Sequence, residues 1–391
     1  MRKNKQVQFL PQTIIIRITV TIMLMVALMG CGATSEPQLE SATEAEAAEI
    51  ALALPTPDKS LQPELAKVTV PTDDIVTLLP QDAIQSILPN QVQYIMVTAA
   101  EANEIGMFKD LQVMGISING ESHAYPISFL SQHEIVNAEI GGQLIAATWW
   151  PLCYTGIVYD RQIDPETTLT FGVSGMLYQN SMIMYDHKTE SLWSHILGQA
   201  IDGAYTGTTL TFLPALQTTW GVWQERHPDS LVVSPDIFSG VDMYDTNGYY
   251  TSRTAGVLGS PNPDTRLPTK EYVIGIRLKG EVKAYPFSTL NEEPVINDEM
   301  AEIPLGIFFD KTAASGAVFD RRLPDGTVLI FEPGPELDIV VDTNTQTQWD
   351  IFTGTALEGE LSGTQLSQIP ITYAFWFGWS DYHQDGQIYG E

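Results

Sequence analysis

Short stretches in which apolar and polar residues alternate, or in which β-branched and aromatic residues dominate, run through most of the chain. Residues 113–118 alternate and end at Asn119-Gly120, a dipeptide typical of a tight hairpin turn. Similar stretches follow at 144–149, 155–159, 169–173, 182–185 and 209–213. Runs of this composition are typical of strands.

Helical patterns are fewer and short. One follows Pro126 at residues 127–132, and another covers residues 216–226, where Trp220 and Trp223 fall on one face. Together the patterns predict an α+β fold that is rich in mostly antiparallel strands and has few short helices.

The strand pattern occurs twice. Residues 115–130 match residues 275–290, which lie 160 positions later, at nine positions. The same offset pairs Asn137 with Asn297 and Asp160-Arg161 with Asp320-Arg321. After a loss of four residues the offset becomes 156, and it then aligns three tryptophans, Trp193, Trp220 and Trp223, with Trp349, Trp376 and Trp379. So many matches in one order predict an internal duplication.

The duplication divides the chain into five predicted parts. Residues 67–234 form the first copy, called the first segment below, and residues 263–391 form the second segment. Residues 235–262, rich in Gly, Ser, Tyr and Asp, are the connector between them. Residues 1–30 and 31–66 precede both segments. We expect the two segments to pack as one pseudo-symmetric body.

Residues 1–30 have the composition of an export signal. They contain four basic residues and no acidic one, and an apolar run from Ile18 to Met29 precedes Gly30-Cys31. Leu28-Met29-Gly30-Cys31 resembles the lipobox of bacterial lipoproteins, in which the cysteine receives lipid. The alternative is an uncleaved signal anchor. Residues 31–66 lack aromatics and read as an acidic flexible tether. We therefore expect an exported lipoprotein of the cell membrane or outer membrane, with its body outside the cytoplasm.

The charge of the chain limits its partners. Nineteen Lys and Arg residues stand against 48 Asp and Glu residues, which gives a formal charge of −29. Such a field repels phosphate backbones, so nucleic acid is a poor partner. Since the chain has only two cysteines, a disulfide-stapled scaffold is excluded.

Comparison of the two copies also distinguishes residues that serve the fold from residues that could form a functional site. Residues present in both copies most simply serve the fold, whereas several reactive or aromatic side chains occur only in the first segment. These are His133, Trp149, Trp150, Cys153, His187 and His195, which align with Glu293, Phe309, Asp310, Ala313, Thr343 and Ile351. We expect a single site in the first segment.

Cys153 and His133 allow three interpretations. The first is a buried thiol and a hydrogen-bonded histidine without a chemical role. The second is a copper or zinc site in which Cys153 and His133 are completed by His123, His187 or His195. The third is nucleophilic catalysis, in which His133 activates Cys153 and Glu134 or Asn137 orients the histidine.

Aromatic residues suggest a different class of function. Trp149, Trp150 and Tyr178, together with Tyr154 and the Tyr249-Tyr250 pair, could line a groove that stacks on a sugar or a hydrophobic ligand. The alternative is core packing, because Trp and Tyr bury large areas in β-rich folds. Tyr249-Tyr250 is the better surface candidate, since it lies in the connector.

Four sequence blocks resemble one uncharacterised prokaryotic family, the domain of unknown function DUF3179. They are His133-Glu134-Ile135-Val136-Asn137, Trp150-Pro151-Leu152-Cys153, residues 173–178 and residues 184–193. The resemblance runs from about residue 90 to 385 and implies no established reaction, substrate or cofactor. In that family the second of these blocks usually reads Cys-Pro-Leu-Cys. Here Trp150 replaces the first cysteine, which excludes an intramolecular dithiol–disulfide cycle. We therefore expect a binding or accessory protein of the cell envelope.

Overall fold

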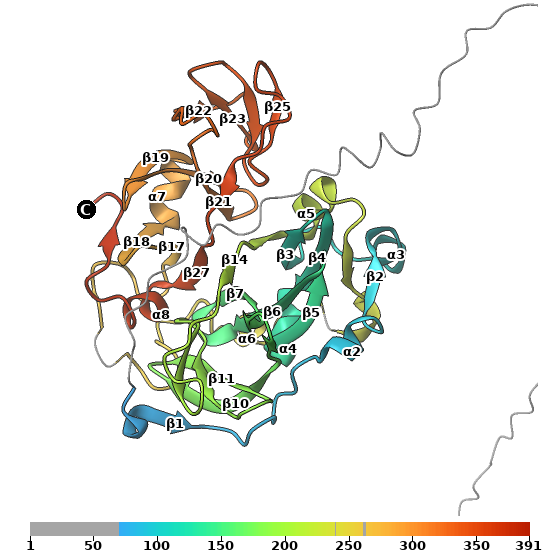
Figure 1. Ribbon diagram of the computed structural model, residues 1–391, viewed down its shortest axis with the longest axis vertical. Helices are drawn as coiled ribbons and strands as arrows, with labels where there is room; N and C mark the ends of the chain where they lie inside the picture. Colours follow the sequence, from blue (N-terminus) through green and yellow to red (C-terminus); the bar gives the residue numbers. More distant parts are fainter. Residues whose placement is uncertain (1–69, 239, 261–262) are drawn as a thin grey trace, which may run out of the picture. The chain divides into compact units, whose positions relative to one another are not determined.

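Strands dominate the computed structural model, which describes residues 70–238, 240–260 and 263–391 (Figure 1). Strands take 42% and helices 15%, with seven short helices among the described residues. The predicted β-rich α+β fold is therefore confirmed. The predicted signal segment 1–30, the tether 31–66 and the lipidation residue Cys31 lie outside the described residues.

The first segment contains a five-stranded sheet built around the predicted hairpin. Its strand order is β15-β3-β4-β16-β2, and only the β16–β4 pair is parallel. The strands are β2 (Met96–Thr98), β3 (Gln112–Ile118), β4 (Glu121–Pro126), β15 (Leu216–Thr219) and β16 (Leu231–Val233). Residues 216–219, expected to be helical, form β15 instead, because they pair with β3.

A second sheet of eight strands contains strands from both segments. Its order is β28-β18-β17-β27-β7-β6-β5, and β14 pairs with β7. The strands are β5 (Ile135–Ile140), β6 (Gln143–Trp150), β7 (Thr155–Asp160), β14 (Phe212–Leu213), β17 (Tyr272–Leu278), β18 (Glu281–Pro286), β27 (Thr372–Phe375) and β28 (Gln387–Ile388). The segments meet where Tyr373 of β27 pairs with Gly156 of β7.

Three further sheets flank these two. The first, in the order β1-β10-β11-β12-β13, comprises Ile75–Thr77, Phe171–Tyr178, Ser181–Asp186, Leu192–Ser194 and Gln199–Asp202. The second, β19-β20-β21-β26, comprises Val295–Met300, Ile303–Asp310, Ser315–Asp320 and Ser367–Gln368. The third, β22-β23-β24-β25, comprises Phe331–Pro333, Ile339–Asp342, Gln348–Asp350 and Ala356–Glu358. The short hairpin β8–β9 spans Gln162–Asp164 and Thr167–Thr168.

The helices are short and mostly sit at strand ends. They are α2 (Pro89–Val92), α3 (Ala99–Ile105), α4 (Ile127–His133), α5 (Trp220–Arg226), α6 (Met243–Thr246), α7 (Phe287–Glu292) and α8 (Trp376–Ser380), with the 3-10 turns η2 (Thr72–Asp74), η3 (Pro151–Cys153) and η4 (Pro235–Ile237). The predicted helix at 127–132 is α4. Within the described residues, every helix is too short or too polar to cross a membrane.

Residues that match between the segments make the same hydrogen bonds. Asn137 exchanges two side-chain hydrogen bonds with the backbone of Phe171, and Asn297 does so with Phe331. The indole Nε1 of Trp193 donates to Asp186 over 3.0 Å, and that of Trp349 donates to Asp342 over 3.0 Å. These residues hold strand ends and turns in place, as expected for scaffold.

Two glycines show why small residues recur at matching positions. A Cβ atom on Gly115 would lie 2.1 Å from the ring of Trp223, and one on Gly275 would lie 2.3 Å from the ring of Trp379. Both strands therefore need glycine where a buried indole crosses them.

Candidate functional site

His133 and Cys153 have separate surroundings. His133 ends α4, and its Nδ1 lies 2.9 Å from the carbonyl oxygen of Gln85 while its ring packs on Phe129. The Cys153 thiol ends η3 and donates to the carbonyl oxygen of Asn180 over 3.4 Å. The two side chains share no partner among the described contacts, so the geometry does not bring the histidine to the thiol.

The Cys153 thiol is poorly suited to ionise. Its side chain is 1% exposed. Burial raises the pKa of the thiol far above its ordinary value, and the negative charge of Asp381 raises it further. A thiol in such surroundings stays protonated and is a weak nucleophile.

Glu134 is buried as an uncharged acid. It has a left-handed backbone (φ 57°), its N–H donates to Leu130, and its carbonyl accepts from Trp149. The side chain is 1% exposed, and neither carboxyl oxygen has a hydrogen-bond partner among the described residues. Burial raises the pKa of this carboxyl to about 8. Glu134 therefore keeps its proton at neutral pH.

The remaining histidines are dispersed. His123 is buried between Glu121 and the hydroxyl of Tyr125, with Nε2 2.9 Å from the Glu121 carboxylate. His187 is exposed and contacts Thr170, whereas His195 is fully buried against Thr148. Across residues 70–238, 240–260 and 263–391, no group of three His, Cys, Asp or Glu side chains could hold a metal ion.

The aromatic candidates divide between core and surface. Trp149 is 0% exposed and Trp150 is 7% exposed, so both indoles are core residues and present no ring to solvent. Tyr178 is half-buried on β10 and meets the ring of Tyr382. Tyr154 directly follows the η3 turn in a left-handed conformation, and its ring packs against Tyr250 of the connector.

Around Tyr154 lies a group of five partly exposed tyrosines, called the tyrosine cluster. Its members are Tyr154, Tyr244, Tyr249, Tyr250 and Tyr272. The ring centroid of Tyr154 is 5.1 Å from that of Tyr250 and 5.0 Å from that of Tyr272. Tyr244 and Tyr249 lie 6.4 and 6.0 Å from Tyr250. The cluster thus joins the η3 turn, the connector and β17.

Two charged residues border the tyrosine cluster. The Lys270 ammonium lies 3.3 Å from the centre of the Tyr249 ring and donates to Ser252 over 2.9 Å. Burial lowers its pKa to about 8. The carboxylate of Asp242 accepts from the hydroxyls of Ser131 and Tyr250 over 2.9 and 3.0 Å.

The hydroxyl groups of the cluster are not all used within the protein. Tyr249 donates to the carbonyl of Leu152 and Tyr250 to Asp242. Those of Tyr154, Tyr244 and Tyr272 have no hydrogen-bond partner among the described residues. Burial raises the pKa of all five, Tyr244 to about 12, so each keeps its proton. Three hydroxyls of the cluster therefore have unused hydrogen-bonding capacity within the described residues.

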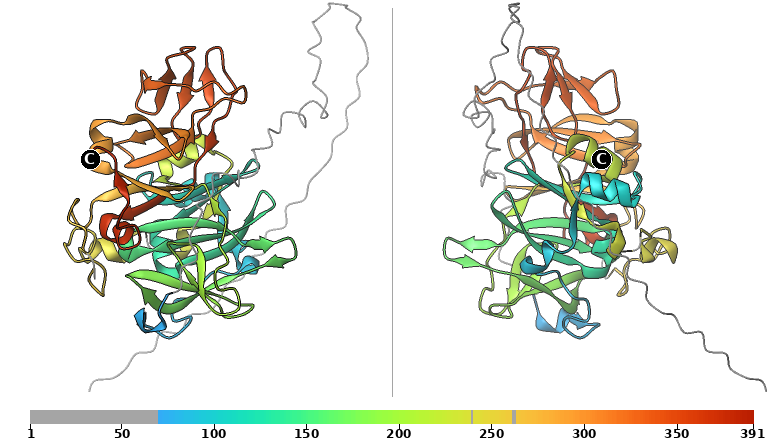
Figure 2. Two further views of the ribbon diagram at one scale, coloured as in Figure 1. Left: turned by 60° about the vertical axis from the view of Figure 1, so that its left-hand side comes forward. Right: turned by 90° about the vertical axis from the view of Figure 1, so that its right-hand side faces the viewer.

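Asn180 holds the connector against the first segment. Its side chain accepts from the N–H of Leu258 over 3.0 Å and donates to the carbonyl of Gly259 over 2.6 Å. Its own carbonyl accepts from the Trp150 indole over 2.6 Å. Near the end of the connector, Ser260 donates to Asp381, the residue that follows α8, and the connector runs beside that helix in Figure 2.

Sequence reasoning missed Asn180, Asp242 and Lys270. None belongs to a matched position of the two segments or to a quoted motif, and their roles depend on how the connector folds back. The density of tyrosines in the connector was the one signal for this site, and it identified Tyr249-Tyr250 but not their neighbours. Asn137, the alternative to Glu134 for orienting His133, bonds only to backbone groups.

Comparison with known proteins gives one result. The model of a family described as protein of unknown function (DUF3179) matches residues 82–386, which cover most of the chain and both segments. No curated protein and no solved structure matches. The chain belongs to the DUF3179 family.

Proposed function

We propose that this DUF3179 protein is a ligand-binding accessory protein of the cell envelope, held at a membrane by lipid on Cys31, and that it binds a neutral saccharide at the tyrosine cluster. One observation carries the proposal. Five partly exposed tyrosines from three parts of the chain converge, and three of their hydroxyls have no partner among the described residues.

The chemistry of the cluster supports a sugar as the ligand. Aromatic faces pack against the apolar faces of pyranose rings, and tyrosine hydroxyls and the Asp242 carboxylate can bond to sugar hydroxyls. The formal charge of −29 opposes anionic polymers of the envelope. A neutral saccharide meets both conditions.

Binding fits the surroundings better than catalysis does. The Cys153 thiol is buried with a raised pKa, and its recorded hydrogen bond is to a backbone carbonyl. Neither the copper or zinc alternative nor the cysteine-enzyme alternative gains support from the described residues. We also infer that the second segment is a supporting copy of the first, because matched residues such as Asn137 and Asn297 make matching hydrogen bonds.

A calorimetric titration tests the proposal. The probe is an uncharged tetramer of β-1,4-linked N-acetylglucosamine, added to mature protein. We expect saturable binding that weakens at least tenfold in Tyr250→Ala and Tyr272→Phe. Tyr389→Ala, which removes a partly exposed tyrosine beside Tyr285, is the control and should leave the affinity unchanged. Absence of binding, or equal loss in the control, would overturn the proposal.

The lipid anchor needs a separate measurement. Mass spectrometry of the membrane-extracted protein should find an acylated Cys31 at the N-terminus. Cys31→Ser should release the protein into the soluble fraction. A retained Met1, or unmodified Cys31, would contradict the anchor without affecting the saccharide site.

A further inference from the structure

Three buried arginines among the described residues differ in how their charge is compensated. Arg161 donates from Nε, Nη1 and Nη2 to the carbonyls of Ile145, Leu169 and Ala138, over 2.8, 2.7 and 3.0 Å. Arg321 makes the matching three hydrogen bonds in the second segment. In both arginines, each of the three guanidinium nitrogens therefore donates to a backbone carbonyl oxygen.

Arg277 is different. It is 6% exposed and makes two recorded hydrogen bonds, to the carbonyl of Ile196 and to the hydroxyl of Thr372, and its Nε has no partner among the described residues. No carboxylate of the described residues forms an ion pair with it. The ring centre of Phe212 lies 4.4 Å from the guanidinium carbon.

Neighbouring titratable groups do not supply the missing negative charge. The pKa of the Arg277 guanidinium falls to about 10 because of burial, so the group stays charged at neutral pH. Tyr159, His195 and His383 are the titratable groups that interact electrostatically with the Arg277 guanidinium. Burial raises the pKa of the Tyr159 phenol and lowers those of both histidines, so all three are neutral near pH 7.

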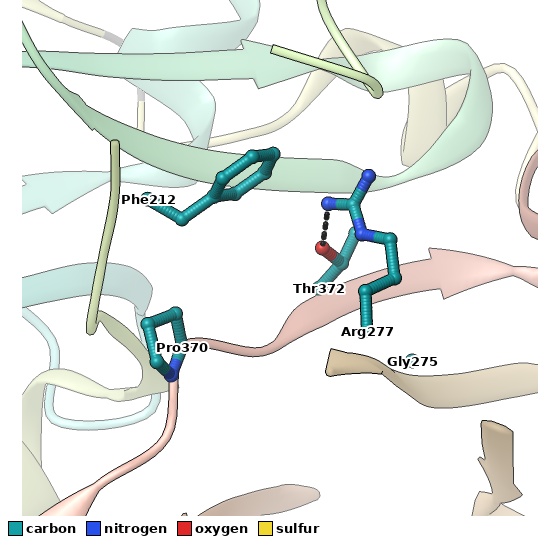
Figure 3. Close-up of a pocket in the computed structure, with 5 residues that line it drawn as sticks. All are labelled: Phe212, Gly275, Arg277, Pro370 and Thr372. Atoms are coloured by element: carbon teal, nitrogen blue, oxygen red, sulfur yellow. Dashed lines mark hydrogen bonds between the residues drawn. The ribbon is translucent and has the colours of Figure 1, made fainter. Parts of the chain in front are cut away.

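A small cavity opens beside this guanidinium. It is lined by Phe212, Gly275, Arg277, Pro370 and Thr372 (Figure 3), and its volume is about 10 Å³. In Figure 3 the Arg277 guanidinium stands between the Phe212 ring and Thr372. A cavity of this size holds about one water-sized particle. It lies between the segments, since Phe212 belongs to β14 and Arg277 to β17.

We propose that this cavity is a halide site, occupied by chloride, in which the anion is the counter-ion of Arg277. An unpaired buried charge is strongly destabilising, and a bound anion removes that cost. The narrow space beside the guanidinium favours a monatomic anion over sulfate, phosphate or a carboxylate ligand. A single water fits but carries no charge.

Bromide diffraction tests occupancy directly. Crystals of the mature protein grown in sodium bromide should show an anomalous peak within hydrogen-bond distance of the Arg277 guanidinium. Bromide has the charge of chloride and nearly its size. Density without an anomalous signal would mean that the cavity holds water only, and it would overturn the proposal.

Thermal unfolding tests the energetic link. In wild type, Tm should rise as sodium chloride replaces sodium gluconate at constant ionic strength, since gluconate is too large for the cavity. Arg277→Gln should abolish this rise. Arg266→Gln is the matched control, because Arg266 also lies over an aromatic ring, that of Trp376, but pairs with the Asp264 carboxylate. The control should keep the chloride response.

If Arg277→Gln fails to fold, the chloride dependence of Tm can be measured in Thr372→Val instead. It removes a hydroxyl that lines the cavity and leaves the cation in place, so the chloride response should persist with weakened affinity. An unchanged Tm in wild type across the chloride series would contradict the proposal whatever the variants do.

Discussion

The same tight turn occurs in both segments, and the two versions are held differently. In the second segment Asp310 closes its own turn, accepting from the N–H and hydroxyl of Thr312 over 2.7 and 2.6 Å. In the first segment Trp150 replaces that aspartate and donates instead to the carbonyl of Asn180. The backbone is nonetheless alike, because Tyr154 and Ala314 both have left-handed conformations, with φ of 51° and 48°.

The difference shows how a site can be placed on a shared backbone. The turn of the second segment is capped by Asp310, a side chain directly before the turn. The turn of the first segment depends on Asn180, which in turn holds Leu258 and Gly259 of the connector. In the first segment the hydrogen bond from Trp150 to Asn180 thus replaces the local cap that Asp310 provides in the second. Because Asn180 also holds the connector, this bond links the position of Tyr154 to that of the connector tyrosines.

The largest effect on stability is expected when the side chains that hold these two turns, Trp150 and Asp310, are removed. Trp150→Ala should lower the free energy of unfolding by about 3–5 kcal/mol, because it leaves a cavity and removes the indole hydrogen bond to the Asn180 carbonyl. Asp310→Ala should cost about 1–2 kcal/mol, since short local hydrogen bonds are lost. Urea unfolding measures both. Equal losses would show that the two turns are held alike.

The next test concerns Glu134, which aligns with the uncharged Pro294. Its folded pKa of about 8 lies above the unfolded value near 4.5, so the contribution of the protonated acid is complete below pH 4.5 and is lost as pH rises toward 8. Glu134→Gln does not titrate. The free energy of unfolding of the variant minus that of wild type should therefore grow by about 1.4 kcal/mol per pH unit between pH 5 and 7.5.

Denaturation of both proteins across this pH range measures the difference, in which shared titrations of Asp381, His195 and other groups cancel. A difference that does not change with pH would mean that Glu134 is ionised in the folded protein.

A smaller effect is expected at Asn180. Asn180→Gly removes the side chain and tolerates the positive φ of 61°. It should cost about 1 kcal/mol for each of the two hydrogen bonds to the connector. Hydrogen exchange at Leu258 should become faster, and saccharide affinity should fall with it. Ala314→Gly is the control in the second segment and should change neither.

The smallest effect is expected at Cys153, which has Ala313 as its counterpart. Cys153→Ala should cost about 1 kcal/mol and leave saccharide affinity unchanged. In the native protein the thiol should resist iodoacetamide at pH 8.5, because it is buried and protonated. Rapid alkylation below that pH would instead favour the cysteine-enzyme interpretation.

Local patterns in the sequence were sufficient for much of the fold. Alternation and turn residues predicted the β3–β4 hairpin, and Pro126 marked the start of α4. They failed at residues 216–219, where pairing with β3 overrides a helical pattern. Such pairing is set by residues a hundred positions away, which no local pattern records.

The candidate site was predicted less completely for the same reason. Comparison of the two copies singled out Cys153 and His133, and the composition of the connector singled out Tyr249-Tyr250. Neither observation gave information on burial or on which side chains approach one another. The neutral state of Glu134 results from its enclosure, and the position of Lys270 results from the path of the connector. Both depend on tertiary packing, which motifs in a single sequence do not report.

The contacts of Tyr373 predict how the protein responds to proteolytic cleavage within the connector. It pairs with Gly156 across the junction of the two segments, and its hydroxyl accepts from the N–H of Gly316 over 3.1 Å. The central sheet is therefore completed by strands from both sides of the connector. A protease nick within residues 240–260 should leave two fragments that migrate as one particle until denaturant is added. Either fragment made alone would expose the bare edge of a strand and should aggregate.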